Sequence, residues 1–462
     1  MVSHVLEPLG GDKLKSHWAA FPAAILIGLL LSALAVSSAK QLILALLVAA
    51  LAAVFLVRMP EIALAMFLVI GVLKGEPTIS LLFRGVDLTL YLAFIVWAAI
   101  AYRLWVGKTA DYSASLLVLT VSFICLMLIS LVQAENPGYG LDKAGRFILL
   151  TSLGLVAPSF ILSQEKAFER FAKTLVLVGL FISLMTIRQW FISPDQLVRV
   201  LGTQYLALGR VAGYGVIVGT YLLAAAAHRR FWKILALVMV VLGSLAILLS
   251  GGRGPALALI FSPVLAAILV GFSQGLRASA RFIMVAVLVL AVFALMYQFN
   301  YLPGVLHDRI AMALNPILTG GTADNSFSFR LVLFSYALSI LRQKPVLGAG
   351  LGAFPIASGF TLFVSSRLYP HNIFLEIAAE LGLAGLTVFV ALLLFAVHRL
   401  TLTLKTQLPA GQRAAIIVNL VLLVFALLNA SITGDINDNK VLWFAIGLAY
   451  AVSRWEKQPD AK

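Results

Sequence analysis

Arg253 lies in the segment of this sequence that is best suited to binding an anion. Residues 250–255 read Ser-Gly-Gly-Arg-Gly-Pro and separate two apolar runs. Glycine lets a ligand approach the backbone, and Pro255 suits the first turn of a helix, where free N–H groups attract anions. Arginine adds a planar fork that matches phosphate oxygens. The segment predicts a phosphate site at a helix start, with snorkelling of the arginine to lipid headgroups as the alternative.

His371 and the apolar segment after it supply groups that could transfer a proton. Histidine titrates near neutral pH, which suits a general acid or base. Glu376 and Glu380 are four residues apart and share one helix face. Lipid would not tolerate them, so we expect both to face the protein interior. Glu380 could orient His371 or an arginine, and a structural hydrogen bond would explain it equally well.

Three more arginines and an asparagine are further candidates. Arg146 and Arg210 each stand at the start of an apolar run, and Arg330 lies in a long loop. An arginine deep in lipid costs about 2.5–3.5 kcal/mol or more. We therefore expect these side chains to face a cavity or the headgroups. Asn372, next to His371, is a possible further site residue.

The composition indicates a polytopic membrane protein. Of the 462 residues, 62% are apolar and 11% are charged, whereas soluble domains are about half apolar and a quarter charged. Long apolar runs without alternation favour an all-α bundle of about 12–14 transmembrane helices over a barrel. The candidate spans are 19–37, 41–57, 61–73, 88–105, 115–133, 146–162, 171–192, 211–227, 232–250, 255–272, 282–299, 373–397, 413–432 and 441–453, the third and last being short.

Basic residues set the expected orientation, because cytoplasmic loops are enriched in lysine and arginine. With Lys13 and Lys15 inside, basic clusters fall in the inner loops and both termini are cytoplasmic. The chain then divides into transmembrane helices over 1–299, a large outer loop over 300–372 and C-terminal helices over 373–462. The net charge of +15 is explained mainly by orientation, so no nucleic-acid partner is expected. The inner basic residues are Lys13, Lys15, Arg58, Arg103, Lys108, Lys166, Arg170, Lys173, Arg229, Arg230, Lys233, Arg277, Arg281, Arg399, Lys405, Arg413, Arg454, Lys457 and Lys462.

Motifs for nucleotides and metals are missing from the sequence. It has no glycine-rich phosphate loop ending in Lys-Ser/Thr, no dinucleotide fingerprint and no His-Glu-x-x-His. Asp435 and Asp438 form a possible metal pair, although a turn between two spans explains them as well. With its single cysteine, Cys125, the chain can form no internal disulfide. A lipid-linked pyrophosphate fits an outer site, because arginines can stabilise the departing anion without a metal or cofactor.

The combined pattern over about 200–390 resembles the O-antigen ligase/polymerase superfamily. Two upstream arginine segments, Arg210-x-x-Gly213 and Ser250-Gly251-Gly252-Arg253-Gly254, are similar to the arginine motifs of that family. The loop pattern is Arg330 … Lys344-Pro345-x-x-Gly348-x-Gly350-x-Gly352-x-Phe354 … His371-Asn372-x-x-Leu375-Glu376 … Glu380-x-Gly382-x-x-Gly385-Leu386.

The resemblance implies a GT-C-like glycosyltransferase of the bacterial inner membrane with a periplasmic active site. Such enzymes transfer glycan, with inversion and without a nucleotide or metal, from an undecaprenyl-pyrophosphate-linked donor. The acceptor is lipid A-core for ligases, a glycan for polymerases, or a protein for related O-oligosaccharyltransferases. By motif, Arg210 and Arg253 would hold the pyrophosphate, Arg330 would contact donor or acceptor, and His371 would occupy the acceptor or base position.

Two other classes stay open at this stage. A flippase or transporter for the same anionic lipids would also place arginines at the outer face, although no internal repeat or broken-helix pair is evident. A structural membrane partner is the third reading. The sequence does not distinguish a ligase from a polymerase.

Overall fold

The computed structural model describes residues 53–73, 87–107, 112–194, 196–225, 230–275, 325–359 and 368–455, with a few residues between 291 and 311. The spans expected at 19–37, 41–57 and 282–299 lie wholly or largely outside this part of the chain. So does the first part of the expected loop, up to residue 324.

The expected all-α membrane bundle is confirmed. Within the described ranges, nine helices are long and apolar enough to cross a membrane. Two adjacent strands, β1 (Arg199–Val200) and β2 (Thr203–Gln204), form a short antiparallel hairpin. The spans are α5 (Leu88–Trp105), α6 (Ala114–Ser130) continued by η2 (Leu131–Gln133), α7 (Pro137–Arg146) continued by η3 (Phe147–Thr151) and α8 (Ser152–Ile161), α9 (Glu165–Ile192), α10 (Tyr205–Ala224), α11 (Arg230–Leu249), α12 (Arg253–Gln274), α17 (Ile373–Leu404) and α18 (Ala410–Ile432).

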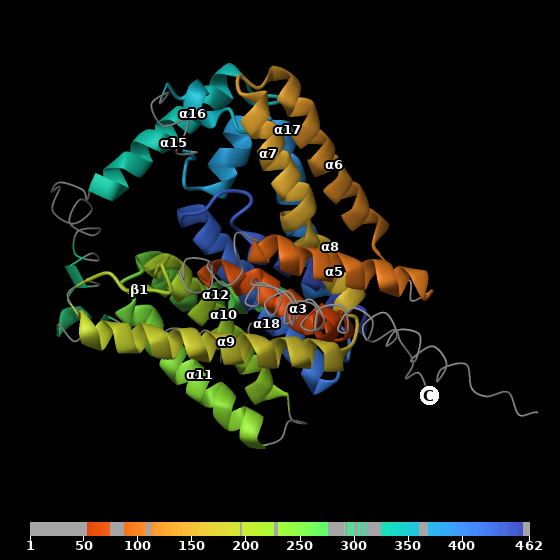
Figure 1. The fold of residues 1–462 in the computed structure, drawn as a ribbon, viewed down its shortest axis with the longest axis vertical. Coiled ribbons are helices and arrows are strands. Elements are labelled where there is room, and N and C mark those ends of the chain that lie inside the picture. Colours follow the sequence, from red (N-terminus) through yellow and green to blue (C-terminus); the bar gives the residue numbers. More distant parts are fainter. Residues whose placement is uncertain are drawn as a thin grey trace, which may run out of the picture.

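Short helices complete the bundle. α3 (Pro60–Val69) with η1 (Ile70–Val72) and α19 (Lys440–Val452) are the short apolar segments that the sequence indicated. The described part of the loop expected over 300–372 contains α15 (Asn325–Gln343) and α16 (Phe354–Ala357). In Figure 1, α6, α7 and α17 stand together, with α15 and α16 beside their upper ends, while α9 and α11 run across the lower part of the view.

Polar residues placed just before apolar runs explain where several helices begin. The Asp87 carboxylate accepts hydrogen bonds from two N–H groups in the first turn of α5, and Ser113 caps α6 in the same way. Asn136 caps α7, and Pro137 occupies its first position. Such side chains satisfy backbone donors that would otherwise be unpaired at a helix start.

An aromatic cluster lies at the centre of the bundle. The ring of Trp443 in α19 packs on Phe123, Phe147 and Phe389, with centroids 5.4, 5.1 and 5.5 Å away. Residues 441–452 of α19 are all buried, which is the pattern of a helix surrounded by other helices. The cluster therefore joins α6, η3, α17 and α19 in one core.

Two predicted span boundaries were wrong. The span expected to start at Arg146 starts at Pro137, so Arg146 lies inside it. The span expected to start at 211 starts at Tyr205, which puts Arg210 in the second turn of α10. The first error arose because residues 138–145 look too polar for a span, and the structure shows that their lysine is neutralised by carboxylates from α17.

Candidate functional site

Arg253 and Arg330 line one cavity of about 290 Å³ between α10, α12, α15 and the end of α18. The two residues were predicted separately, and the fold brings them together. The cavity also contains the start of α12, so its free N–H groups and positive dipole end lie in the same wall. The complete lining is Tyr205, Leu206, Arg253, Gly254, Leu257, Arg330, Leu331, Phe334, Ser431 and Ile432.

Close packing of α10 on the start of α12 positions Arg253. A Cβ added at Gly209 would lie 3.0 Å from the Cβ of Pro255, so any larger residue would require the two helices to shift slightly apart. Before the helix, Gly251 has a φ of 77°, and the Ser250 hydroxyl accepts a hydrogen bond from the N–H of Gly252 at 3.3 Å. The expected helix start with a proline in its first turn is confirmed.

His371 lies beside this cavity. The Asn372 amide donates a hydrogen bond to the carbonyl of Ser431, a lining residue, at 3.0 Å. The Asn372 side-chain oxygen also caps α17 by accepting from the N–H groups of Phe374 and Leu375. Asn372 therefore has a definite structural role: it fixes His371 between the start of α17 and the cavity wall.

The imidazole of His371 is held in a strained and partly desolvated setting. Its φ is 58°, a left-handed conformation that costs on the order of 1–3 kcal/mol in a non-glycine residue and is typical of functional sites. Its ring packs on Tyr369 at 4.3 Å, and its buried Nδ1 has no hydrogen-bond partner. Burial, and then the positive charge of Arg330, lower the pKa of His371 to about 4, so the neutral ring predominates at pH 7.

Arg210 and Arg146 lie near a different group, the carboxylate of Asp438. Arg210 Nη2 donates to the carbonyl of Thr433 at 2.9 Å, and its buried Nε has no partner. Arg146 pairs with Asp142 at 3.4 Å. Burial and the negative charge of Asp435 raise the pKa of Asp438 to about 6. The positive charges of Arg210, Lys440 and Arg146 oppose this rise.

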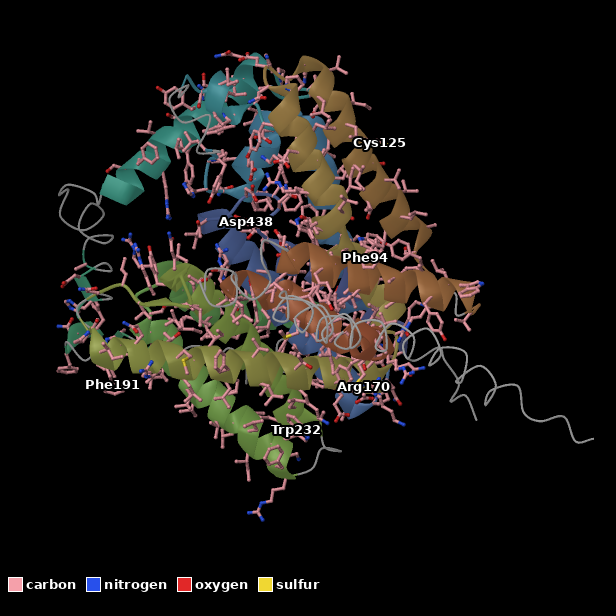
Figure 2. The ribbon with its side chains drawn as sticks, in the orientation of Figure 1. Phe94, Cys125, Arg170, Phe191, Trp232 and Asp438 are labelled. Atoms are coloured by element: carbon pink, nitrogen blue, oxygen red, sulfur yellow. The ribbon has the colours of Figure 1, made fainter. Side chains whose placement is uncertain are left out.

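Asp438 is a candidate site residue that the sequence analysis placed in a possible metal pair with Asp435. Its partner Asp435 accepts hydrogen bonds from the N–H groups of Asn437 and Asp438, so Asp435 forms the turn that presents Asp438. Asp438 has an accessible surface, although protein atoms surround its carboxylate densely enough to raise its pKa, and it is labelled near the middle of the molecule in Figure 2. Among the described residues, no group of three or more His, Cys, Asp or Glu side chains could hold a metal ion.

Glu376 and Glu380 face the interior, as expected, but their partner is a lysine. Lys143 Nζ lies 2.5 Å from Glu376 Oε1 and 2.7 Å from Glu380 Oε2, and the three side chains are at most 2% exposed. Asn437 donates to the carbonyl of Lys143 and accepts from the Thr151 hydroxyl. This buried cluster therefore connects α7, α17 and the α18–α19 turn. The structure thus pairs Glu380 with Lys143, rather than with His371 or an arginine as we expected.

The glycine-rich loop over residues 348–352 packs on α17. Gly348, Gly350 and Gly352 all have positive φ, which confirms the expected tight turn. The N–H of Ala349 donates to Ala379 O at 2.8 Å, and that of Gly350 donates to Glu380 O at 3.0 Å. An added Cβ at Gly348 would lie 2.5 Å from the backbone of Glu380. These glycines therefore pack against the backbone of α17, the helix that carries Glu376 and Glu380.

A comparison with protein families identifies a match within the chain. Residues 238–390 match the family model for O-antigen ligase. This match, over about a third of the chain, supports the O-antigen ligase/polymerase superfamily. The resemblance inferred from the motifs is thereby confirmed, and the matched O-antigen ligase segment contains Arg253, Arg330, His371, Glu376 and Glu380. Arg146, Arg210 and Asp438 lie outside it. No curated protein matches the chain.

Proposed function

We propose that the protein transfers a glycan from an undecaprenyl-pyrophosphate-linked donor to an acceptor hydroxyl on the periplasmic side of the bacterial inner membrane. The observation that supports this most is the shared cavity of Arg253 and Arg330 beside His371. Two guanidinium groups and a helix start suit a pyrophosphate, and the neighbouring imidazole suits the incoming hydroxyl.

In the proposed reaction the acceptor oxygen attacks the anomeric carbon, and the bond from that carbon to the pyrophosphate oxygen breaks. One displacement inverts the anomeric configuration. Arg253 and Arg330 stabilise the charge that develops on the leaving pyrophosphate. The hydroxyl proton passes to the neutral imidazole of His371, and Asp438 is the second candidate acceptor because its raised pKa lies closer to neutral pH.

Exposed leucines line this cavity and suit the lipid tail of such a donor. Leu257 and Leu331 line the cavity and are 40% and 49% exposed, respectively. The rim of the cavity therefore carries one surface leucine from the span α12 and one from α15. A polyprenyl chain could stay in lipid along this rim while its pyrophosphate reaches the arginines. The acceptor remains open among a glycan, lipid A-core and a protein.

The proposed reaction requires the site to face the periplasm, which thiol labelling can test. Val346 is 66% exposed in the loop on the start of α17, and Lys405 is exposed just past the other end of α17. In a Cys125→Ser background, Val346→Cys should react with an impermeant maleimide in intact spheroplasts. Lys405→Cys should react only after permeabilisation, because it belongs to an expected cytoplasmic basic cluster.

The matched pair makes the result decisive. Both positions are exposed, so a difference between them reports sidedness rather than burial. The reverse pattern, with Lys405→Cys labelled in intact spheroplasts, would place the site in the cytoplasm and overturn the proposed reaction.

A further inference from the structure

A second cavity, of about 610 Å³, lies between residues 53–60 and the last turns of α5. The charged residues in its lining, Arg58 and Arg103, are both arginines. The apolar part of the wall includes Val54, Val57 and Val106. A cavity lined by two cationic groups and by aliphatic side chains matches an amphiphilic anion.

Neighbouring groups do not neutralise these two arginines. Glu61 is buried, and its carboxylate binds Arg170 and also attracts Arg103, so this single negative charge is shared between two arginines. Arg103 donates to the carbonyl of Phe160, a neutral acceptor that leaves its positive charge in place. Arg58 is exposed. The cavity wall therefore keeps a net positive charge.

Exposed aromatic residues place this cavity at the depth of lipid headgroups. Tyr102 and Trp105, at the end of α5, are 56% and 86% exposed. Tyrosine and tryptophan are enriched where a membrane span meets water. The arginines of the cavity belong to the basic residues expected on the cytoplasmic side, where anionic lipids attract such clusters.

We infer that this cavity binds the headgroup of an anionic membrane phospholipid, with its phosphate between Arg58 and Arg103 and an acyl chain along the apolar wall. Arginine suits this role because its fork donates two parallel hydrogen bonds to phosphate oxygens. The lining of this cavity shares no residue with that of the Arg253 cavity, so the inference does not depend on the proposed reaction.

Lipid binding to the full chain tests the inference. Delipidated protein in neutral detergent is titrated with phosphatidylglycerol and, separately, with phosphatidylcholine, and bound lipids are counted by native mass spectrometry. We expect a high-affinity phosphatidylglycerol site that phosphatidylcholine does not fill. Arg58→Gln should weaken it about tenfold, the effect of losing one charge-assisted contact, and Arg58→Lys should weaken it less.

Lys405→Gln is the matched control, because it removes one exposed positive charge at the cytoplasmic end without altering the cavity. It should leave the phosphatidylglycerol affinity unchanged. An equal loss in Lys405→Gln would mean a general charge effect and would overturn the inference. So would equal affinities for the two lipids, unchanged binding in Arg58→Gln, or displacement of the lipid by an equimolar amount of inorganic phosphate.

Discussion

Replacing Lys143 with methionine should cost about 3–5 kcal/mol of stability, the usual effect of removing one partner from a buried ion pair. Methionine keeps the length of the side chain but removes its charge. Glu376 and Glu380 would then face each other without a cation, and both are buried. The loss should appear as a large drop in the apparent Tm of the purified protein in detergent.

Two controls separate this buried cluster from an ordinary ion pair. Lys173 also pairs with a glutamate, Glu169, but both side chains are about a quarter exposed, so Lys173→Met should cost at most about 1 kcal/mol. The triple variant Lys143→Met with Glu376→Gln and Glu380→Gln should recover part of the stability, because it leaves no unpaired charge. Equal Tm losses in Lys143→Met and Lys173→Met would contradict a structural role for the cluster.

Substitutions in the proposed site should separate donor binding from chemistry. Arg253→Gln should weaken binding of the pyrophosphate-linked donor by about 1.5–3 kcal/mol, the value of a hydrogen bond to a charged group. Arg253→Lys should recover only part of this, since lysine lacks the planar fork. His371→Ala should bind donor almost normally but turn over roughly 10²–10⁴-fold more slowly, the range for a lost general base.

Donor titrations and single-turnover rates measure the two effects independently. Arg188→Gln is the control: Arg188 is exposed in α9 and does not line the cavity, so both quantities should stay unchanged. If His371→Ala loses donor affinity as much as Arg253→Gln, the histidine is a phosphate ligand. If it retains its turnover, His371 has only a structural role before α17.

The pH dependence of kcat/KM identifies the proton acceptor. Because burial and Arg330 lower the pKa of His371, its basic form is present above about pH 4 and is lost as the pH falls through that value. A His371 base therefore predicts an acidic limb near pH 4. An Asp438 base predicts a limb near pH 6 that disappears in Asp438→Asn. In kcat the His371 limb should move to higher pH, because bound pyrophosphate stabilises the imidazolium.

Local sequence signals were enough to locate many helices and the main candidate residues. The span 88–105 was predicted to the residue, since Asp87 caps a long apolar run. The Gly-Arg-Gly-Pro segment around Arg253 correctly predicted a helix start in the wall of a cavity. These signals depend on neighbours in the chain, which a single sequence displays directly.

Long-range contacts account for what the sequence could not predict. Arg330 reaches the cavity of Arg253 because Leu333, Ala337 and Ile340 of α15 pack with Ala379 of α17. Lys143 meets Glu376 and Glu380 only through the packing of α7 on α17. The polar stretch at 138–145 was the available signal for Lys143, because a lysine before an apolar run requires either water or a buried partner.

The position of Asp438 near two arginines was not predicted, for a related reason. The sequence Gly-Asp-Ile-Asn-Asp-Asn over 434–439 shows a polar turn between two spans, and a turn is the ordinary explanation for such residues. Asp435 does form that turn. The nearness of Asp438 to Arg146 and Arg210 depends on how α7, α10 and the α18–α19 turn come together, so it becomes evident only in the structure.

The most direct test of the proposed function is glycan transfer by the purified protein in proteoliposomes. The vesicles contain an undecaprenyl-pyrophosphate-linked glycan and an acceptor, with EDTA present and no nucleotide. The proposal predicts a product with one new glycosidic bond of inverted configuration, identified by mass spectrometry and NMR, together with released undecaprenyl pyrophosphate. Movement of the intact donor between leaflets without any new bond would contradict the proposal and show a flippase instead.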